Sequence, residues 1–261
     1  MKVFRRIILV LLSVLVVCGL AFVIYTSNYY QAVDVDRYLP LDVKTSDKIQ
    51  SVSNDVRCEI IDDNIWFYPK NKTAQEEAFV FYPGGKVESS AYAPIMYMLA
   101  QRGYISVIVD MPFNLAMFGV NGANNVISRN DKINNVDYSD KKWFIGGHSL
   151  GGAFAAKYYS QHTNMISGLV LLASYSTYDL TKYSNSSVLS IYGSCDKVLN
   201  MDKYNSNKSN LPSNFVEHII DGGNHGQFGS YGNQSGDGEA TISALSQWMI
   251  TTNYIIDFME A

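Results

Sequence analysis

Cysteine is scarce in this sequence, with 3 residues in 261. Cys18 lies in a long apolar run, so Cys58 and Cys195 are the only thiols outside it. No pair of cysteines has the short spacing of a zinc site, and two isolated thiols do not make the disulfide framework of a small secreted domain. We therefore expect unpaired thiols and no metal.

Charge is also limited, and it shows no basic surplus. Charged residues make up 17% of the chain, and the net charge of −4 argues against nucleic acid as a partner. The hydrophobic fraction of 47% excludes a disordered chain. With 261 residues, the chain can form one domain with a well-buried core but not two ordinary domains and an anchor. The sequence leaves the oligomeric state open.

A long apolar run occurs at the N-terminus. Residues 7–25, which follow Lys2, Arg5 and Arg6, carry no charge and can cross a bilayer as a helix. The run is longer than the apolar core of a typical signal peptide and lacks a clear cleavage site, so a transmembrane anchor is favoured over a cleaved signal. Because the positive charges precede it, we predict that residues 1–6 are cytoplasmic and that the remainder lies outside the cytoplasm, at the cell membrane.

Residues 26–54 are polar and mixed, which indicates a linker, and residues 55–261 are predicted to form the folded domain. Short apolar runs predict strands, and longer periodic segments predict helices. The expected strands are 60–61, 65–68, 78–82, 105–109, 142–146, 168–172, 187–192 and 215–220; the expected helices are 92–101, 150–161 and 238–259. This alternation predicts an α/β fold: a mostly parallel sheet with helices on both faces and ligands at the carboxyl ends of its strands.

One motif suggests chemistry. Residues 147–151, Gly-His-Ser-Leu-Gly, match the pattern G-x-S-x-G between a predicted strand and an Ala-rich helix. A serine on such a sharp turn needs small neighbours two positions before and after it, and the helix N-terminus favours a developing oxyanion. We therefore predict that Ser149 is a nucleophile; the alternative is a glycine-rich turn without chemistry.

A serine hydroxyl needs a base within hydrogen-bond reach. His225 lies in the Gly-rich loop 222–226 after the last predicted strand. In α/β folds whose nucleophile lies on a turn of this kind, the histidine base comes last in the chain. The other histidines fit less well: His148 would point away from Ser149, His162 ends a helix, and His218 lies within a strand. His225 is the predicted base.

The residue that orients the base should follow a strand between the serine and the histidine. Asp196 follows the predicted strand 187–192 directly, and is preferred over Asp179 and Asp202. The resulting order of serine, aspartate and histidine is the one expected of an α/β-hydrolase fold.

The same edge of the sheet should supply two backbone donors for an oxyanion. We expect Leu150, next after the serine, and Gly85, with Lys86 as the alternative to Gly85. The segment 111–119 is apolar for a loop, so Asn114 and Leu115 are candidate pocket residues; core packing under the loop is the alternative. Lys86, near the expected oxyanion donors, is a third candidate, with a solvated surface charge as the alternative. Only about fourteen residues separate two later strands, which predicts an open site.

Five blocks of sequence in this order resemble the α/β-hydrolase fold-5 family, which is distantly similar to dienelactone hydrolases. They are residues 83–88, 111–116, 146–152, 192–196 and 222–229, and the resemblance spans about residues 56–255. It implies a Ser-Asp-His hydrolase with no metal or organic cofactor. Dienelactone hydrolases have a cysteine nucleophile where this chain has Ser149, so their substrate is not implied.

These observations predict a membrane-anchored serine hydrolase, similar to carboxylesterases and lipases, that cleaves a small-molecule or lipid ester. Acyl transfer to another acceptor would use the same residues. A non-catalytic cell-surface binding domain on this scaffold is the alternative from another class of function.

Overall fold

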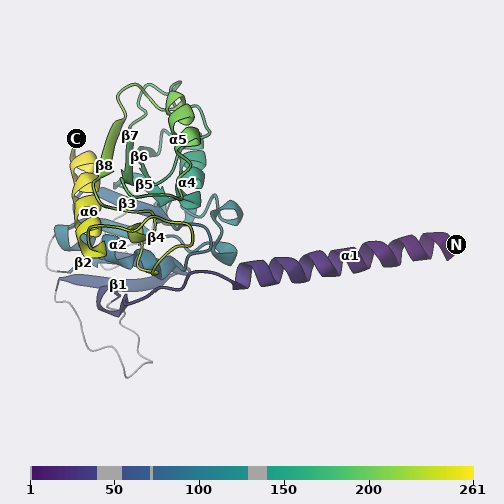
Figure 1. Cartoon of the computed structure of the whole chain (residues 1–261). Coiled ribbons are helices and arrows are strands. Elements are labelled where there is room, and N and C mark those ends of the chain that lie inside the picture. The colour runs from purple at the N-terminus through teal and green to yellow at the C-terminus, as the bar shows by residue number, and fades with distance from the viewer. Residues whose placement is uncertain (1, 40–54, 71–72, 129–139) are drawn as a thin grey trace.

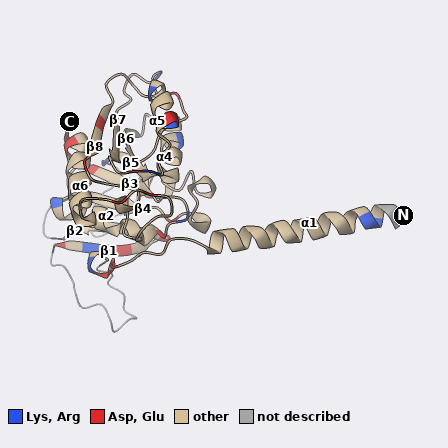
Figure 2. Cartoon of the chain, viewed as in Figure 1, with Lys and Arg blue, Asp and Glu red and all other residues tan. Residues whose placement is uncertain are grey.

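The computed structural model describes residues 2–39, 55–70, 73–128 and 140–261, and its long first helix projects away from a layered body (Figure 1). Helix α1 (Lys2–Ser27) is longer than the predicted anchor at both ends. Its segment Phe4–Ser27 contains a window of 18 residues with a mean hydropathy of 3.3, none of which is buried, and this makes the segment a candidate transmembrane span. Basic side chains in α1 lie only toward its N-terminal end (Figure 2).

The body contains a sheet of eight strands in the order β1-β2-β4-β3-β5-β6-β7-β8. The strands are β1 (Val56–Ile61), β2 (Asn64–Pro69), β3 (Glu77–Tyr82), β4 (Ile105–Ile108), β5 (Lys142–His148), β6 (Ile166–Leu172), β7 (Val188–Gly193) and β8 (Val216–Ile220). Strands β1 and β2 form an antiparallel hairpin, and β2 pairs antiparallel with β4. The six strands β3 to β8 are parallel to one another. This confirms the predicted α/β fold with a mostly parallel sheet.

Helices cover both faces of the sheet (Figure 1). The helices α2 (Ala93–Arg102) and α6 (Ala244–Glu260) pack on one face, and α3 (Asn124–Ile127) and α4 (Leu150–Gln161) on the other; α5 (Met201–Asn207) follows β7. Helix α2 ends at Gly103, whose φ of +111° closes the helix in the left-handed region.

Helix α6 begins at residue 244 and not at residue 238 as predicted, which is a correction. Ser243 caps it, because the hydroxyl oxygen accepts a hydrogen bond from the Ser246 amide at 3.1 Å. The residues before the cap pair with the loop after β8, where the Thr241 amide donates to the Gly222 carbonyl at 2.8 Å. That pairing replaces the first turns of the predicted helix.

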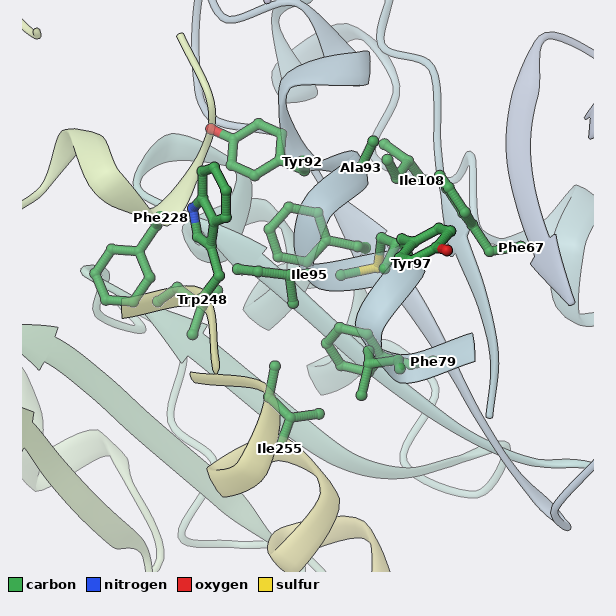
Figure 3. Close-up of a cluster of buried hydrophobic side chains, with 14 of the residues drawn as sticks. Phe67, Phe79, Tyr92, Ala93, Ile95, Tyr97, Ile108, Phe228, Trp248 and Ile255 are labelled. Carbon is green, nitrogen blue, oxygen red and sulfur yellow. The ribbon is translucent and has the colours of Figure 1, made fainter. Parts of the chain in front are cut away.

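The alternation of side chains along β3 divides the core into two layers. Phe79 and Phe81 face the layer that holds α2 and α6, while Val80 and Tyr82 face the other. Figure 3 shows part of the first layer, in which Phe228 and Trp248 lie on one side of Ile95 and Phe79 lies on the other. Burial on both faces fixes the strand register, and the register places the carboxyl ends of the strands side by side.

Part of the predicted linker packs on the body. Residues 28–39, which we call the strap, run from α1 along the loops at the carboxyl edge of the sheet. The Tyr30 amide donates to the Lys86 carbonyl at 2.8 Å, and the Glu88 amide donates to the Tyr30 carbonyl at 2.9 Å. Farther along, the Val33 amide donates to the Ser230 carbonyl at 2.7 Å. Residues 40–54 of the predicted linker lie outside the described residues.

Candidate active site

Ser149 lies on a strained turn between β5 and α4. Its φ of 52° and ψ of −121° are values that residues other than glycine rarely adopt. A Cβ atom at Gly147 would lie 2.5 Å from the carbonyl carbon of Gly151, and one at Gly151 would lie 2.2 Å from the Tyr82 oxygen. The turn therefore requires both glycines, as the motif predicts. The Ser149 amide donates to the Leu172 carbonyl at 2.9 Å, which fixes the turn to β6.

His225 lies in the loop after β8 and is almost wholly buried, with 1% of its surface exposed. Its Nδ1 atom is 2.8 Å from Oδ2 of Asp196. Because an ionised carboxylate only accepts hydrogen bonds, Nδ1 carries a hydrogen, and the lone pair of the neutral ring is on Nε2. No described residue is hydrogen-bonded to Nε2. The carboxylate thus fixes the orientation of the imidazole and leaves Nε2 without a hydrogen-bond partner among the described residues.

Asp196 is held by its own loop. Its Oδ1 atom accepts hydrogen bonds from the amides of Val198 and Leu199, each at 2.8 Å. The amide of the preceding residue, Cys195, donates to the Gly223 carbonyl at 2.8 Å, which joins the loops after β7 and β8. Two amides on one carboxylate oxygen leave the other oxygen directed at His225.

A hollow of about 330 Å³ adjoins these side chains. Its lining consists of Ser149, Leu150, Ala153, Ala173, Ser174, Tyr175, Thr177, Val198, Leu199, Asn200 and His225. The volume is at the lower end of the range for small-molecule sites. The connection between β6 and β7 contributes Ser174, Tyr175 and Thr177 to the lining and contains no helix or strand.

The two expected oxyanion donors are adjacent. Leu150 begins α4, where the helix leaves the first amides without intrahelical partners. A Cβ atom at Gly85 would lie 2.8 Å from Cδ2 of Leu150. The amides on either side of Gly85 are engaged, since Gly84 donates to the Tyr92 hydroxyl at 3.0 Å and Lys86 donates to the Asn114 carbonyl at 2.7 Å. Of the two candidates, Gly85 therefore keeps the available amide.

The sequence matches the alpha/beta hydrolase family over residues 78–249, which is more than half of the chain. The chain belongs to the alpha/beta hydrolase family. This confirms the family predicted from the five blocks of sequence. No curated protein sequence matches the chain. Among solved structures, the hydrolase is similar to Est1E from Butyrivibrio proteoclasticus, with 12% identity, a TM-score of 0.54, and coverage of 79% of this chain and 100% of that chain. At this identity the likeness shows a shared fold.

A second histidine lies beside the candidate base of this alpha/beta hydrolase. The ring centroids of His148 and His225 are 4.5 Å apart, and Nδ1 of His148 is 2.8 Å from the Tyr92 hydroxyl. The Tyr92 oxygen accepts the Gly84 amide and gives its hydrogen to His148. Burial, reinforced by the neighbouring His225, lowers the pKa of His148 well below its usual range. His148 is therefore neutral, and through Tyr92 it links the loop that holds Gly84 to the surroundings of His225.

Sequence reasoning missed Gln247, a fully buried side chain on α6. Its Oε1 atom accepts the Asn224 amide at 3.0 Å, and its Nε2 atom donates to the Asn224 carbonyl at 2.8 Å. Asn224 directly precedes His225, so this pair of bonds, which we call the latch, fixes the loop that carries the base. The available signal was a polar residue beside Trp248 on the core-facing side of an amphipathic helix.

The tentative pocket residues lie to one side of the hollow. Lys86, Asn114 and Leu115 are neighbours of one another, but none contributes to the lining beside Ser149. Leu115 is buried, which fits the alternative of core packing under the loop. The Lys86 ammonium lies 4.3 Å from the centre of the Tyr25 ring in α1.

The rival residues make other contacts. His162 stacks on Tyr158 and His218 stacks on Tyr254, with centroids 4.0 Å and 3.8 Å apart. The side chains of both rival carboxylates are exposed: Asp179 lies in a loop and accepts a hydrogen bond from Thr181, and Asp202 lies in the first turn of helix α5. Within the described part of the chain, no group of three or more His, Cys, Asp or Glu side chains is arranged to hold a metal ion.

Proposed function

We propose that this alpha/beta hydrolase is a membrane-anchored serine hydrolase that cleaves an ester-like bond through Ser149, His225 and Asp196. One observation carries the proposal: the imidazole bonded to Asp196 at 2.8 Å and the serine on the strained turn line the same hollow. A nucleophile, a base and a residue that orients the base are the parts that acyl transfer requires.

In the first half of the reaction, the Ser149 hydroxyl attacks the carbonyl carbon of the ester. Nε2 of His225 accepts the hydroxyl proton as the new bond forms, and Asp196 stabilises the resulting imidazolium. The negative charge that develops on the carbonyl oxygen is bound by the amides of Leu150 and Gly85. Loss of one such donor typically slows the reaction by a factor of about 100 to 1,000.

The alcohol then leaves as His225 returns the proton to it, and an acyl group remains on Ser149. Water attacks this acyl-enzyme with His225 again acting as the base. The open connection between β6 and β7 leaves space for the leaving group and for water. The small hollow favours an acyl chain or alcohol of modest size at the reacting centre.

The anchor in this proposal is the apolar segment 7–25 of α1. The segment Phe4–Ser27 has the length and composition to cross a bilayer, and a helix at this position in the chain also fits a signal sequence. Arg5 and Arg6 precede the uncharged residues 7–25, which supports a cytoplasmic N-terminus and a catalytic domain outside the cytoplasm.

The proposal is tested with a fluorophosphonate probe and a series of aryl esters of increasing acyl length, applied to the full chain in detergent. We expect the probe to label the protein covalently and the Ser149→Ala substitution to abolish labelling and lower kcat at least about a thousandfold. Ser206→Ala, on an exposed face of α5, is the matched control and should behave as the unmodified protein.

Two outcomes would contradict the proposal. Labelling that persists in Ser149→Ala would place the nucleophile elsewhere, and the absence of both labelling and ester turnover would favour a binding domain. Product analysis in the presence of competing alcohols and amines separates hydrolysis from acyl transfer. Retention of the full-length chain in the membrane fraction, with the N-terminus protected from added protease in sealed cells, tests the anchor and its orientation.

A further inference from the structure

The connection after β4 exposes large apolar side chains. Phe113, Met117 and Phe118 are 54%, 51% and 51% exposed, and we call them the apolar patch. They lie in the short turns Pro112–Asn114 and Ala116–Phe118, and the rings of Phe113 and Phe118 are 5.6 Å apart. Three such side chains within six positions form a local apolar surface of the kind that marks an interaction site.

The apolar patch contacts the candidate membrane span. The ring of Phe22 in α1 is 5.1 Å from that of Phe113 and 5.8 Å from that of Phe118. Phe22 lies five positions before the end of the segment Phe4–Ser27, which is roughly 7.5 Å along a helix axis. A span of 24 residues is about 36 Å long against a hydrocarbon core of about 30 Å. In a bilayer crossed by α1, Phe22 and the rings that contact it therefore lie near the depth of the hydrocarbon boundary.

The same region adjoins the candidate active site. Lys86, which follows the proposed oxyanion donor Gly85, donates its amide to Asn114 in the connection that carries the patch, at 2.7 Å. Its ammonium lies over the ring of Tyr25 near the end of α1. Aromatic rings and lysines of this kind are common at the interface between bilayer and water.

The strap limits how the domain turns about the anchor. It begins directly after α1 and is hydrogen-bonded to the loops after β3 and β8. Both loops lie at the carboxyl edge of the sheet, where Ser149 and His225 also lie. Figure 1 shows α1 leaving the body directly from this short connection, beside the turns of the apolar patch. The edge that carries the candidate site is thus also the edge from which α1 leaves the domain.

We propose that the carboxyl edge of the sheet rests on the outer leaflet of the bilayer, with the apolar patch inserted beside Phe22. The site then receives amphiphilic esters, whose acyl chains reside in that leaflet, from the plane of the membrane. This inference rests on the proposed anchor and on the proposed hydrolase site, and it adds the orientation of the domain and the class of substrate.

Insertion is tested by tryptophan fluorescence in phosphatidylcholine vesicles whose acyl chains carry bromine, a contact quencher. The native Trp66, Trp143 and Trp248 are buried, with 0%, 2% and 6% exposure, so they give a nearly constant background. The full chain is compared with its Phe113→Trp and Phe118→Trp variants. We expect the added fluorescence in both variants to be quenched by bromine placed near the hydrocarbon boundary.

Two further variants make the result interpretable. Met165→Trp is the matched control, because Met165 is 46% exposed and precedes β6 at the opposite edge of the sheet; it should not be quenched. Leu12→Trp, in the middle of α1, reports whether the anchor is inserted. Quenching at Leu12→Trp without quenching at Phe113→Trp or Phe118→Trp overturns the docked orientation and leaves the anchor intact. No quenching at Leu12→Trp overturns the anchor and with it this inference.

The substrate class is tested with the double variant Phe113→Asn/Phe118→Ser in vesicles. Asn suits position 113, whose φ is +60°. We expect kcat/KM to fall about tenfold for a long-chain ester dissolved in the bilayer and to stay unchanged for a short-chain, water-soluble ester. No loss on either ester, or an equal loss on both, overturns the inference. Fluorophosphonate labelling of Ser149 in the same samples reports separately on the proposed hydrolase site.

Discussion

The latch, formed by two hydrogen bonds between Gln247 on α6 and Asn224 beside His225, allows a quantitative prediction. In the Gln247→Leu variant, a side chain of similar size replaces the amide, and the buried amide and carbonyl of Asn224 lose the partners that now lie at 3.0 Å and 2.8 Å. Each unsatisfied buried group costs about 1–3 kcal/mol. We therefore expect the free energy of unfolding to fall by about 3 kcal/mol.

The same substitution should impair catalysis, because the loop can regain hydrogen bonds with water only by moving outward and carrying His225 away from Asp196. If the displaced loop is favoured by about 2 kcal/mol, roughly one molecule in thirty keeps His225 paired with Asp196, since 1.4 kcal/mol corresponds to a factor of ten. We expect kcat to fall about thirtyfold, with a much smaller change in KM.

The assay combines urea unfolding of the full chain in detergent with steady-state turnover of a water-soluble aryl ester. Asn253→Leu is the control on the same helix, because Asn253 is exposed, and its stability should change by less than about 0.5 kcal/mol. Wild-type kcat in a Gln247→Leu protein that is destabilised as expected would refute the positioning role. Wild-type stability would refute the energetic argument itself.

Three further predictions concern the residues around the base. Asp196→Asn should lower kcat at least about a thousandfold while the protein stays folded, because Nδ1 of His225 loses its acceptor; steady-state kinetics beside a circular dichroism spectrum checks this. Tyr92→Phe should lower the free energy of unfolding by about 1–3 kcal/mol, because the Gly84 amide and His148 both lose their partner; urea unfolding measures it, and no change would contradict the buried bond. Because the pKa of His148 is lowered in the folded state, the unfolded chain binds the extra proton, and stability should fall as the pH drops below about 6.5. His148→Gln should reduce the slope of stability against pH between about 5.5 and 6.5; an unchanged slope would show that His148 does not titrate as described.

The sequence predicted the elements whose signals are local. Eight apolar runs correspond to the eight strands of the sheet, and the G-x-S-x-G motif marks a turn whose glycines are required by contacts below 3 Å. The positions of the candidate base and acid also followed from local signals, since each comes in a loop directly after a strand. The pairing of His225 with Asp196 at 2.8 Å is the arrangement which that order predicts.

The remaining features depend on contacts between distant segments. Gln247 and Asn224 are separated by 23 positions, and Tyr92 and His148 by 56, so no periodic pattern connects them. The segment 111–119 reads as apolar, but its composition does not separate the buried Leu115 from the exposed Phe118. Composition also does not show that a polar segment such as the strap is hydrogen-bonded to the loops at the carboxyl edge of the sheet and is not a free linker.

The latch also sets an order of assembly. Synthesis runs from the N-terminus, so the strands that carry the proposed nucleophile and acid are complete before residue 247 is made. A chain that stops before this position can bury most of its sheet, yet the backbone of residue 224 would lack both hydrogen bonds of the latch. We therefore expect full competence for turnover to arise only when the last helix has been made.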